Sequence, residues 1–193
     1  MPQDVESIFR ESGALMEGHF LLSSGQHSPA YWEKFRILQY PYYTEKLCRR
    51  IVERFRGEKP ELVAGPTVGG IILAYEVAHQ LGLRGIFAER EDAKRAFRRG
   101  FSIAPGERVL VVDDVLTTGG SVKEVIEAVK DLRGLVVGVG VLIDRSNGEV
   151  NFGVPLFSCH KVHVPTYSAS SCPLCAVGVP LIKPGSTPTA GQG

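Results

Sequence analysis

Short runs of consecutive apolar residues constrain the fold of this chain more than any other feature. They fall within residues 62–65, 85–88, 108–114 and 135–144. Successive side chains on a strand point to opposite faces of a sheet, so an uninterrupted apolar run indicates a strand buried on both faces. Two stretches with helical periodicity, residues 68–81 and 121–133, separate these runs. The alternation predicts an α/β fold with a doubly wound, mainly parallel sheet flanked by helices.

The segments around this sheet complete the predicted domain. Residues 2–15 and 41–56 have the apolar spacing of helices. Residues 19–35 contain two short alternating segments joined by a connection rich in Ser, Gly and Pro, which indicates a β-hairpin that we call the hood. A chain of 193 residues fits one domain with one core. The expected boundaries are residues 1–183 for a single domain, 1–40 for the part that includes the hood, 62–145 for the ligand-binding core and 184–193 for a flexible tail.

Composition excludes several classes of protein. The formal net charge is +1, which is too balanced for a chain whose main partner is nucleic acid or an anionic membrane. No apolar stretch reaches the roughly 18–20 residues of a membrane span, and the N-terminus lacks the basic start and apolar run of a signal peptide. We therefore expect a cytoplasmic protein. Four cysteines are too few for a disulfide scaffold at this length, and a reducing compartment would leave them as thiols or metal ligands.

The chemistry concentrates in one stretch, residues 109–129. An apolar strand ends in Asp113 and Asp114, and after two apolar residues comes the loop Thr117–Ser121, which opens a helix. Ligands of open α/β sheets bind beyond the carboxyl ends of the strands. Glycines, hydroxyls and unpaired helix N–H groups suit a phosphate monoester, whereas paired carboxylates suit the two hydroxyls of a ribose. The pattern therefore favours a sugar 5-phosphate over a plain strand end followed by an N-cap, and no G-x-x-x-x-G-K-[ST] or G-x-G-x-x-G motif is present.

The same order of residues resembles the phosphoribosyl pyrophosphate (PRPP) motif of the type I phosphoribosyltransferases. That motif has four apolar residues, two acids, two apolar residues, and then a loop of Thr, Gly and Ser. Other stretches resemble the members of the family that act on orotate, and they are residues 20–31, 65–70, 98–122, 141–146, 172–175 and 181–186. The resemblance implies the type I phosphoribosyltransferase fold. It further implies a Mg²⁺-dependent homodimer that transfers the phosphoribosyl group of PRPP to N1 of orotate, which gives orotidine 5′-monophosphate and pyrophosphate in pyrimidine (UMP) synthesis.

The resemblance also implies roles for individual residues. The PRPP site would comprise Asp113, Asp114, Thr117, Thr118, Gly119, Gly120, Ser121, Thr67, Val68, Gly69, Gly70, Arg90 and Lys94. The orotate site would comprise Ser23, Ser24, Gly25, Gln26, Thr117 and Arg145, whose planar guanidinium suits a carboxylate. The catalytic set would be Lys94, Arg98, Arg99, Asp113 and Asp114. No protein ligand is expected for Mg²⁺, because this ion prefers substrate phosphates and water.

Residues 89–100 carry five basic and three acidic side chains just before the PRPP strand. They could form a solvated loop, but their position favours a lid whose cations neutralise the departing pyrophosphate. By resemblance this mobile loop acts on the active site of the partner subunit. The family pattern Lys-x-His-Gly is absent here, so Lys94, Arg98 and Arg99 all remain candidates for its loop lysine. Ser23 likewise stands where some members have Lys.

Two alternatives for the function and one for the cysteines stay open. The sugar-phosphate site would serve equally a phosphoribosyltransferase for a purine or uracil, or a PRPP-sensing regulator. The spacing C-x₃-H-x₈-C-x₂-C permits a zinc site, although thiols in a turn or a redox-labile disulfide fit the sequence as well. The candidate zinc ligands are Cys159, His163, Cys172 and Cys175.

Overall fold

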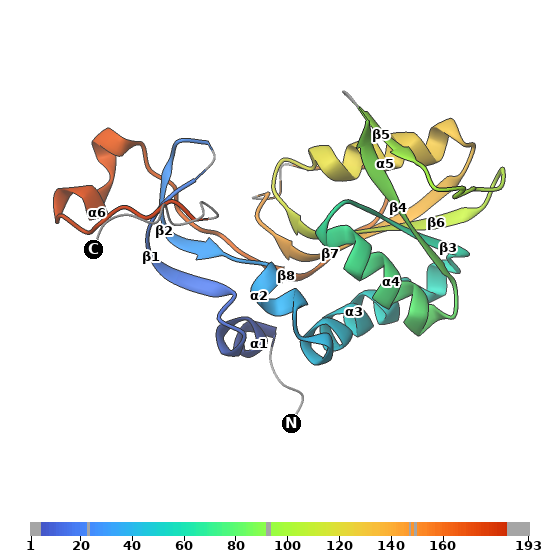
Figure 1. Cartoon of the computed structure of the whole chain (residues 1–193), viewed down its shortest axis with the longest axis horizontal. Helices are drawn as coiled ribbons and strands as arrows, with labels where there is room; N and C mark the ends of the chain where they lie inside the picture. The colour runs from blue at the N-terminus through green and yellow to red at the C-terminus, as the bar shows by residue number, and fades with distance from the viewer. Residues whose placement is uncertain (1–4, 23, 92–93, 147, 149, 185–193) are drawn as a thin grey trace.

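A six-stranded sheet forms the centre of the computed structural model, which describes residues 5–22, 24–91, 94–146, 148 and 150–184 (Figure 1). The strand order is β5-β4-β3-β6-β7-β8, and only β5 is antiparallel to its neighbour. The strands are β3 (Leu62–Pro66), β4 (Arg84–Glu91), β5 (Lys94–Phe97), β6 (Arg108–Leu116), β7 (Leu135–Asp144) and β8 (Leu156–Lys161). The predicted doubly wound, mainly parallel sheet is confirmed.

Helices cover both faces of this sheet. One face packs against α1 (Val5–Glu11), α2 (Phe35–Leu38), α3 (Pro41–Phe55) and α4 (Gly69–Leu81), and the other against α5 (Gly120–Asp131). Strand β3 shows the period-two alternation, because Val63 belongs to the first core whereas Leu62 and Ala64 belong to the second. The strands are therefore buried on both sides, as their continuous apolar runs predict.

The first helix is shorter than its prediction of residues 2–15. Helix α1 ends at Glu11, Gly13 adopts a left-handed φ of +67°, and strand β1 begins at Leu15. A glycine at such a position is a common helix stop, since it adopts positive φ without the steric cost of a Cβ atom. The prediction for residues 41–56 is confirmed by α3, which is followed by the 3₁₀ turn Arg56–Glu58.

The hood is a two-stranded antiparallel sheet, as expected, of β1 (Leu15–Leu21) and β2 (His27–Trp32). The described C-terminal segment, residues 162–184, runs beside it, which the sequence did not predict. Isolated bridges join Phe20 to Ile182 and His27 to Tyr167. The 3₁₀ turn Ala169–Ser171 and the short helix α6 (Pro173–Ala176) therefore lie beside the hood at one end of the molecule (Figure 1).

The charged stretch 89–100 contains regular structure. Strands β4 and β5 pair antiparallel from Ala88 with Phe97 to Glu91 with Lys94. Strand β4 pairs with β3 only as far as Ala88, so the hairpin extends past the carboxyl edge of the sheet. In the described part of the chain, no helix is long and apolar enough to span a membrane. Residues 185–193, most of the expected tail, lie outside the described residues.

Candidate active site

The strand order places a crevice beyond the carboxyl ends of β3 and β6. From β3 the chain adds β4 on one side and then β6 on the other, so the winding direction reverses between β3 and β6. Ligands of open α/β sheets bind at such a switch point. The loop after β3 and the loop after β6 meet here, and together they contain most of the residues assigned to PRPP from the sequence.

Asp113 and Asp114 lie at this edge, near the C-terminal end of β6, and both are buried. The backbone N–H of Asp114 donates to Asp113 Oδ1 at 2.8 Å, and that of Val115 donates to Asp114 Oδ1 at 2.6 Å. Gly69, at the start of α4, packs directly on the Asp114 carboxylate, and a Cβ atom on Gly69 would overlap with it. Only glycine at position 69 lets the β3 loop approach the acid pair so closely.

Burial beside a second carboxylate makes Asp113 a weak acid. Loss of solvation is the main cause and the charge of Asp114 adds to it, so the pKa of Asp113 rises to about 7. The backbone hydrogen bond from Asp114 and the charges of Lys34 and Arg95 act in the opposite direction. The acid pair can therefore change its charge near neutral pH.

Lys34 is a site residue that the sequence did not reveal. It follows β2 in the chain, and its Nζ lies 3.0 Å from Asp114 Oδ1 and 2.9 Å from Oδ2. The Asp114 side chain is 3% exposed, so this ion pair compensates a buried carboxylate. No motif marks Lys34, because its partner is 80 positions away in the sequence.

The loop Thr117–Ser121 forms an open cradle beside the acid pair. Thr117, Thr118 and Ser121 are exposed, and α5 begins at Gly120 with its first N–H groups unpaired by the helix. Gly119 adopts a φ of +77°, and a Cβ atom there would lie only 2.8 Å from Val150 Cγ1. Glycine thus satisfies two restraints at position 119, one of backbone conformation and one of space.

Arg95 on β5 is a second site residue that sequence reasoning missed. Its Nη1 donates to Thr67 Oγ1 at 3.0 Å and to the carbonyl of Ala88 at 3.2 Å. Its Nε lies 3.2 Å from Glu124 Oε2 on α5, and the side chain is 7% exposed. Arg95 therefore fixes the loop that contains Thr67 against the hairpin and against α5. No local pattern marks Arg95, because β5 is charged and its partner Thr67 is 28 positions away in the sequence.

The structure separates the three cations assigned to the mobile loop. Lys94 is exposed and lies next to the hairpin tip, in register with Glu91. Arg98 forms an ion pair with Glu91, and Arg99 forms a bidentate pair with Glu89 at 2.9 and 2.7 Å. The backbone of Arg98 and Arg99 follows Phe97, the last paired residue of β5, whereas Lys94 is the first, although the Arg98 side chain reaches back to Glu91. Arg90 also points back to the domain, with Nη2 3.5 Å from Glu124 Oε1.

Arg145 lies beside the cradle, at the end of β7. Its backbone N–H donates to the carbonyl of Leu116 at 2.8 Å, and the turn is held by Asp144 Oδ1, which accepts bonds from the Ser146 N–H and hydroxyl at 2.9 and 2.6 Å. Partial burial lowers the pKa of Arg145 below its ordinary value, and the hood residue Tyr31 interacts with its charge. No carboxylate among the described residues pairs with this guanidinium.

The other orotate candidates lie on the exposed turn of the hood. Ser24, Gly25 and Gln26 connect β1 to β2, and the turn is closed by the Leu22 N–H, which donates to the carbonyl of Gln26 at 2.8 Å. No hydrogen bond or ion pair among the described residues joins this turn to Asp113, Thr117 or Arg145. Ser23 lies outside the described residues.

The four zinc candidates do not come together. Cys159, on β8, packs against the first core, where its Sγ donates to the Leu47 carbonyl at 3.3 Å and burial raises its pKa to about 12. Cys172 and Cys175 instead lie with His19 and His27. The predicted set is therefore wrong in Cys159 and His163, because β8 belongs to the central sheet and the C-x₂-C turn belongs to the hood.

Comparison with known proteins identifies the class to which this fold and site belong. The phosphoribosyl transferase domain matches residues 42–161, which include the acid pair and the cradle. The chain belongs to the phosphoribosyltransferase family.

Several relatives that match nearly the whole chain are orotate phosphoribosyltransferases. Orotate phosphoribosyltransferase from Caldanaerobacter subterraneus subsp. tengcongensis is 55% identical over 184 residues, which cover 95% of this chain and 97% of that protein. The enzyme of the same name from Desulforamulus reducens is 53% identical and covers 95% and 96%. Among solved structures, orotate phosphoribosyltransferase from Aeropyrum pernix has a TM-score of 0.66 and 28% identity, with 81% of this chain and 93% of that chain covered.

Proposed function

We propose that this chain is an orotate phosphoribosyltransferase. It would transfer the 5-phosphoribosyl group of PRPP to N1 of orotate and release pyrophosphate, as the pyrimidine pathway requires for orotidine 5′-monophosphate. The observation that carries this proposal is the meeting, at one edge of the sheet, of an acid pair, a phosphate cradle and a guanidinium that no carboxylate of the described residues pairs with. In this reading residues 1–183 act as one domain, because the sheet supplies the PRPP site and the hood supplies part of the base site.

Each group at this edge suits one part of PRPP. The exposed hydroxyls and free N–H groups of Thr117–Ser121 would hold the 5′-phosphate. Asp113 and Asp114 would accept the two ribose hydroxyls, and Thr67–Gly70 would contact the pyrophosphate. Lys34 and Arg95 would act as positioning residues, since Lys34 neutralises Asp114 and Arg95 holds Thr67. Such a site contributes by orienting the reactants and by stabilising the charge that develops on pyrophosphate.

Arg145 would select the base. A half-buried guanidinium without a carboxylate partner is complementary to a planar anion, and orotate carries a carboxylate that neutral bases lack. Arg145 neighbours Leu116, so the base would lie next to the ribose held by Asp113. Ser23–Gln26 and Thr117 would complete this site by resemblance to the orotate-specific members.

Mg²⁺ would arrive with PRPP. This ion favours oxygen ligands, usually one or two carboxylates together with substrate phosphates and water. Asp113 and Asp114 are assigned to the ribose and Asp114 pairs with Lys34, so substrate phosphates and water would supply the ligands of the ion. When bound, the ion would neutralise charge on the leaving pyrophosphate.

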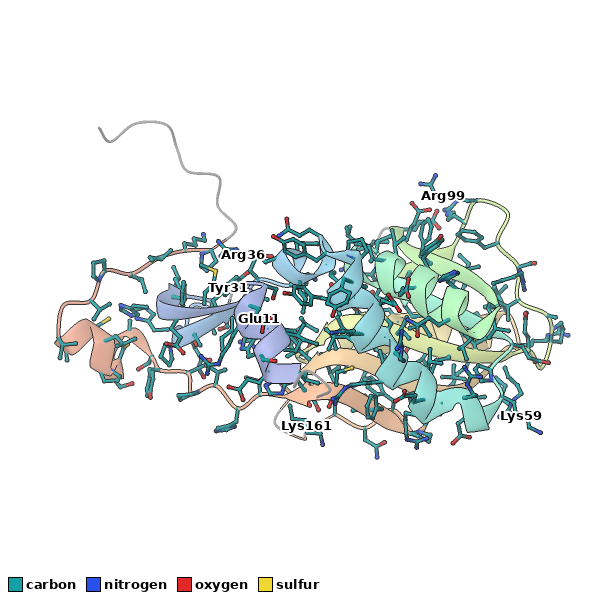
Figure 2. The ribbon with its side chains drawn as sticks, turned by 90° about the horizontal axis from the view of Figure 1, so that it is seen from below. Glu11, Tyr31, Arg36, Lys59, Arg99 and Lys161 are labelled. Atoms are coloured by element: carbon teal, nitrogen blue, oxygen red, sulfur yellow. The ribbon has the colours of Figure 1, made fainter. Side chains whose placement is uncertain are left out.

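The remaining cations would close the site from a second subunit. We assign the role of the family's loop lysine to Lys94, because it is exposed beside the hairpin tip whereas Arg98 and Arg99 pair with acids of their own hairpin. Arg99 also lies far from Tyr31 along the long axis of the molecule (Figure 2). A homodimer with this hairpin acting in trans would bring Lys94 to the partner's PRPP.

A direct assay tests the proposal. Purified protein is mixed with PRPP, Mg²⁺ and orotate, and the loss of orotate absorbance is followed beside parallel reactions with uracil, hypoxanthine and adenine. We expect turnover of orotate alone. Turnover of a neutral base at a comparable rate would show that the chain is a phosphoribosyltransferase for that base. PRPP binding without turnover of any base would indicate a PRPP-sensing regulator.

A further inference from the structure

A compact group of two histidines and two cysteines lies in the hood, away from the PRPP site. The ring nitrogens His19 Nε2 and His27 Nδ1 are 2.9 Å apart. Cys172 Sγ lies 3.4 Å from His19 Nε2, and Cys175 Sγ lies 3.7 Å from the same atom and 3.3 Å from His27 Nδ1. All four ligand atoms lie within 4.8 Å of one another. We propose that these four side chains bind a structural Zn²⁺ ion.

The distances fit a tetrahedral ion. Zinc bonds of about 2.0–2.1 Å to nitrogen and about 2.3 Å to sulfur place the ligand atoms of a tetrahedron about 3.4 Å apart for two nitrogens, about 3.6 Å for nitrogen and sulfur and about 3.8 Å for two sulfurs. The three measured nitrogen–sulfur distances lie within about 0.3 Å of that expectation, and the nitrogen–nitrogen distance of 2.9 Å is about 0.5 Å shorter than it. The four donors, two thiols and two imidazoles, form one of the common structural zinc sets, and tetrahedral S₂N₂ geometry favours zinc among biological metals.

A second contact fixes one imidazole for metal binding. His19 Nδ1 lies 2.8 Å from the carbonyl of Val179, which can only accept a hydrogen bond. The proton of a neutral His19 therefore belongs on Nδ1, and Nε2 faces the cysteines with a free electron pair. Imidazoles that bind metals are commonly oriented in this way by a backbone carbonyl. Val179 follows the C-x₂-C turn, so the orienting group and the thiols come from the same segment.

The C-terminal segment also needs a cross-link that the apolar core does not supply. Among the described residues from 162 to 184, Cys172 alone is buried, and the apolar side chains of Val177, Leu181 and Ile182 are exposed. A segment that buries so little apolar surface gains little stability from the hydrophobic effect. Backbone bonds hold it beside the hood, including those from the Ile182 N–H to His19 and from the His27 N–H to Tyr167, at 2.8 and 2.9 Å. A metal ion at the four-residue group would join it to β1 and β2.

The position of the ion would have a consequence for the base site, which rests on the proposed function. His19 and His27 lie on the two strands that flank the turn with Ser24–Gln26. Zinc would therefore hold both sides of the turn assigned to orotate, while the PRPP site stays on the central sheet. Loss of zinc should weaken orotate binding and leave PRPP binding unchanged.

Metal content tests the proposal directly. The chain is purified without chelators, and zinc is measured by elemental analysis in the wild type, in Cys175→Ser and in the control Cys159→Ser, whose thiol lies in the sheet core. We expect about one zinc per chain in the wild type and in the control, and a loss of most of the metal in Cys175→Ser. Cys175 is an exposed residue, so this substitution leaves the apolar core intact.

A spectroscopic measurement on the wild-type protein tests the same site without relying on a variant that folds. Wild-type protein stripped of metal is titrated with Co²⁺, and tetrahedral S₂N₂ coordination should give visible d–d bands together with sulfur-to-cobalt charge transfer. Zinc should abolish these bands when it displaces cobalt. Absence of both zinc and cobalt binding, equal metal loss in Cys159→Ser, or a Cys172–Cys175 disulfide in the native protein would each overturn the proposal.

The consequence for orotate has its own readout. In metal-stripped enzyme the KM for orotate should rise at least several-fold, the Kd for PRPP should stay constant, and added Zn²⁺ should restore the KM. Zinc binding together with an unchanged KM for orotate would refute only the link between the metal and the base site. Zinc binding by a protein that never consumes orotate would refute the proposed function and leave the metal site standing.

Discussion

Asp113 couples the charge of the site to pH. Its pKa in the folded chain is about 7, above the ordinary value of 3.8, because burial and Asp114 disfavour the ionised form. Between these two pKa values the folded chain binds the proton and the unfolded chain does not. The contribution of Asp113 to stability is therefore fully present below pH 3.8 and is lost as pH rises through about 7.

This linkage gives a prediction for Asp113→Asn. The asparagine cannot titrate, so the stability of the wild type relative to the variant should fall by roughly 2–3 kcal/mol between pH 5 and pH 8. Urea unfolding of both proteins at several pH values measures the difference, in which the titrating groups remote from Asp113 cancel. A difference that stays constant over this range would show that Asp113 is already ionised at pH 5.

Arg145 is expected to recognise the carboxylate of the base. Arg145→Gln should raise the KM for orotate roughly 10- to 100-fold, since hydrogen bonds to a charged group contribute about 1.5–3 kcal/mol. Uracil serves as the matched control ligand, because it has the same ring without the carboxylate. Its inhibition constant should change little in the variant. An equal loss for orotate and uracil would indicate that Arg145 shapes the pocket and does not recognise the carboxylate.

At the scale of elements, Gly119 connects β6 to α5 and shapes the phosphate cradle. Gly119→Ala should weaken PRPP binding, because the new methyl group would meet Val150 at 2.8 Å in a backbone conformation that already costs alanine energy. Gly106→Ala is the matched control, since Gly106 has a similar φ of +81° and open space around it. Both variants should lose about 1 kcal/mol of stability through strain, and only Gly119→Ala should lose PRPP affinity. Calorimetric titration with PRPP separates the two effects.

Four strands of the sheet could be predicted from the sequence, and the two edge strands could not. Strands β3, β4, β6 and β7 follow from runs of consecutive apolar residues. Strand β5 has the charged sequence Lys94–Phe97, and β8 mixes polar with apolar residues, so neither has the pattern of a buried strand. Their positions depend on the neighbouring strands β4 and β7, which the local sequence does not specify.

The candidate site divides in the same way. The acid pair and the cradle occur in one continuous stretch, so their order in the sequence was informative. The contacts of Lys34 with Asp114 and of Arg95 with Thr67 span 80 and 28 positions, and no local pattern encodes them. The zinc candidates failed for the same reason. The C-x₂-C half was local, whereas its histidine partners are about 150 residues away on the hood strands.

At the scale of the whole molecule, the hood and the described C-terminal segment lie together, whereas the β4–β5 hairpin lies elsewhere. Strands β1 and β2 of the hood bridge to the C-terminal segment, and the hood reaches the proposed PRPP site through Lys34 and the proposed base site through Tyr31. The β4–β5 hairpin extends from the opposite edge of the sheet. An active site completed by a partner's hairpin would therefore combine the hood of one subunit with the lid of the other.

A mixing experiment tests this arrangement in trans. One inactive protein carries Lys94→Ala, and another carries Asp113→Asn together with Asp114→Asn. The two are dissociated, combined in equal amounts and reassembled. Random pairing in a two-fold dimer makes about half of the dimers mixed, and each mixed dimer would have one site with both defects and one with neither. Activity should return to about a quarter of that of the wild type. If the hairpin served its own subunit, every site would keep one defect, and the mixture would stay as inactive as its parents.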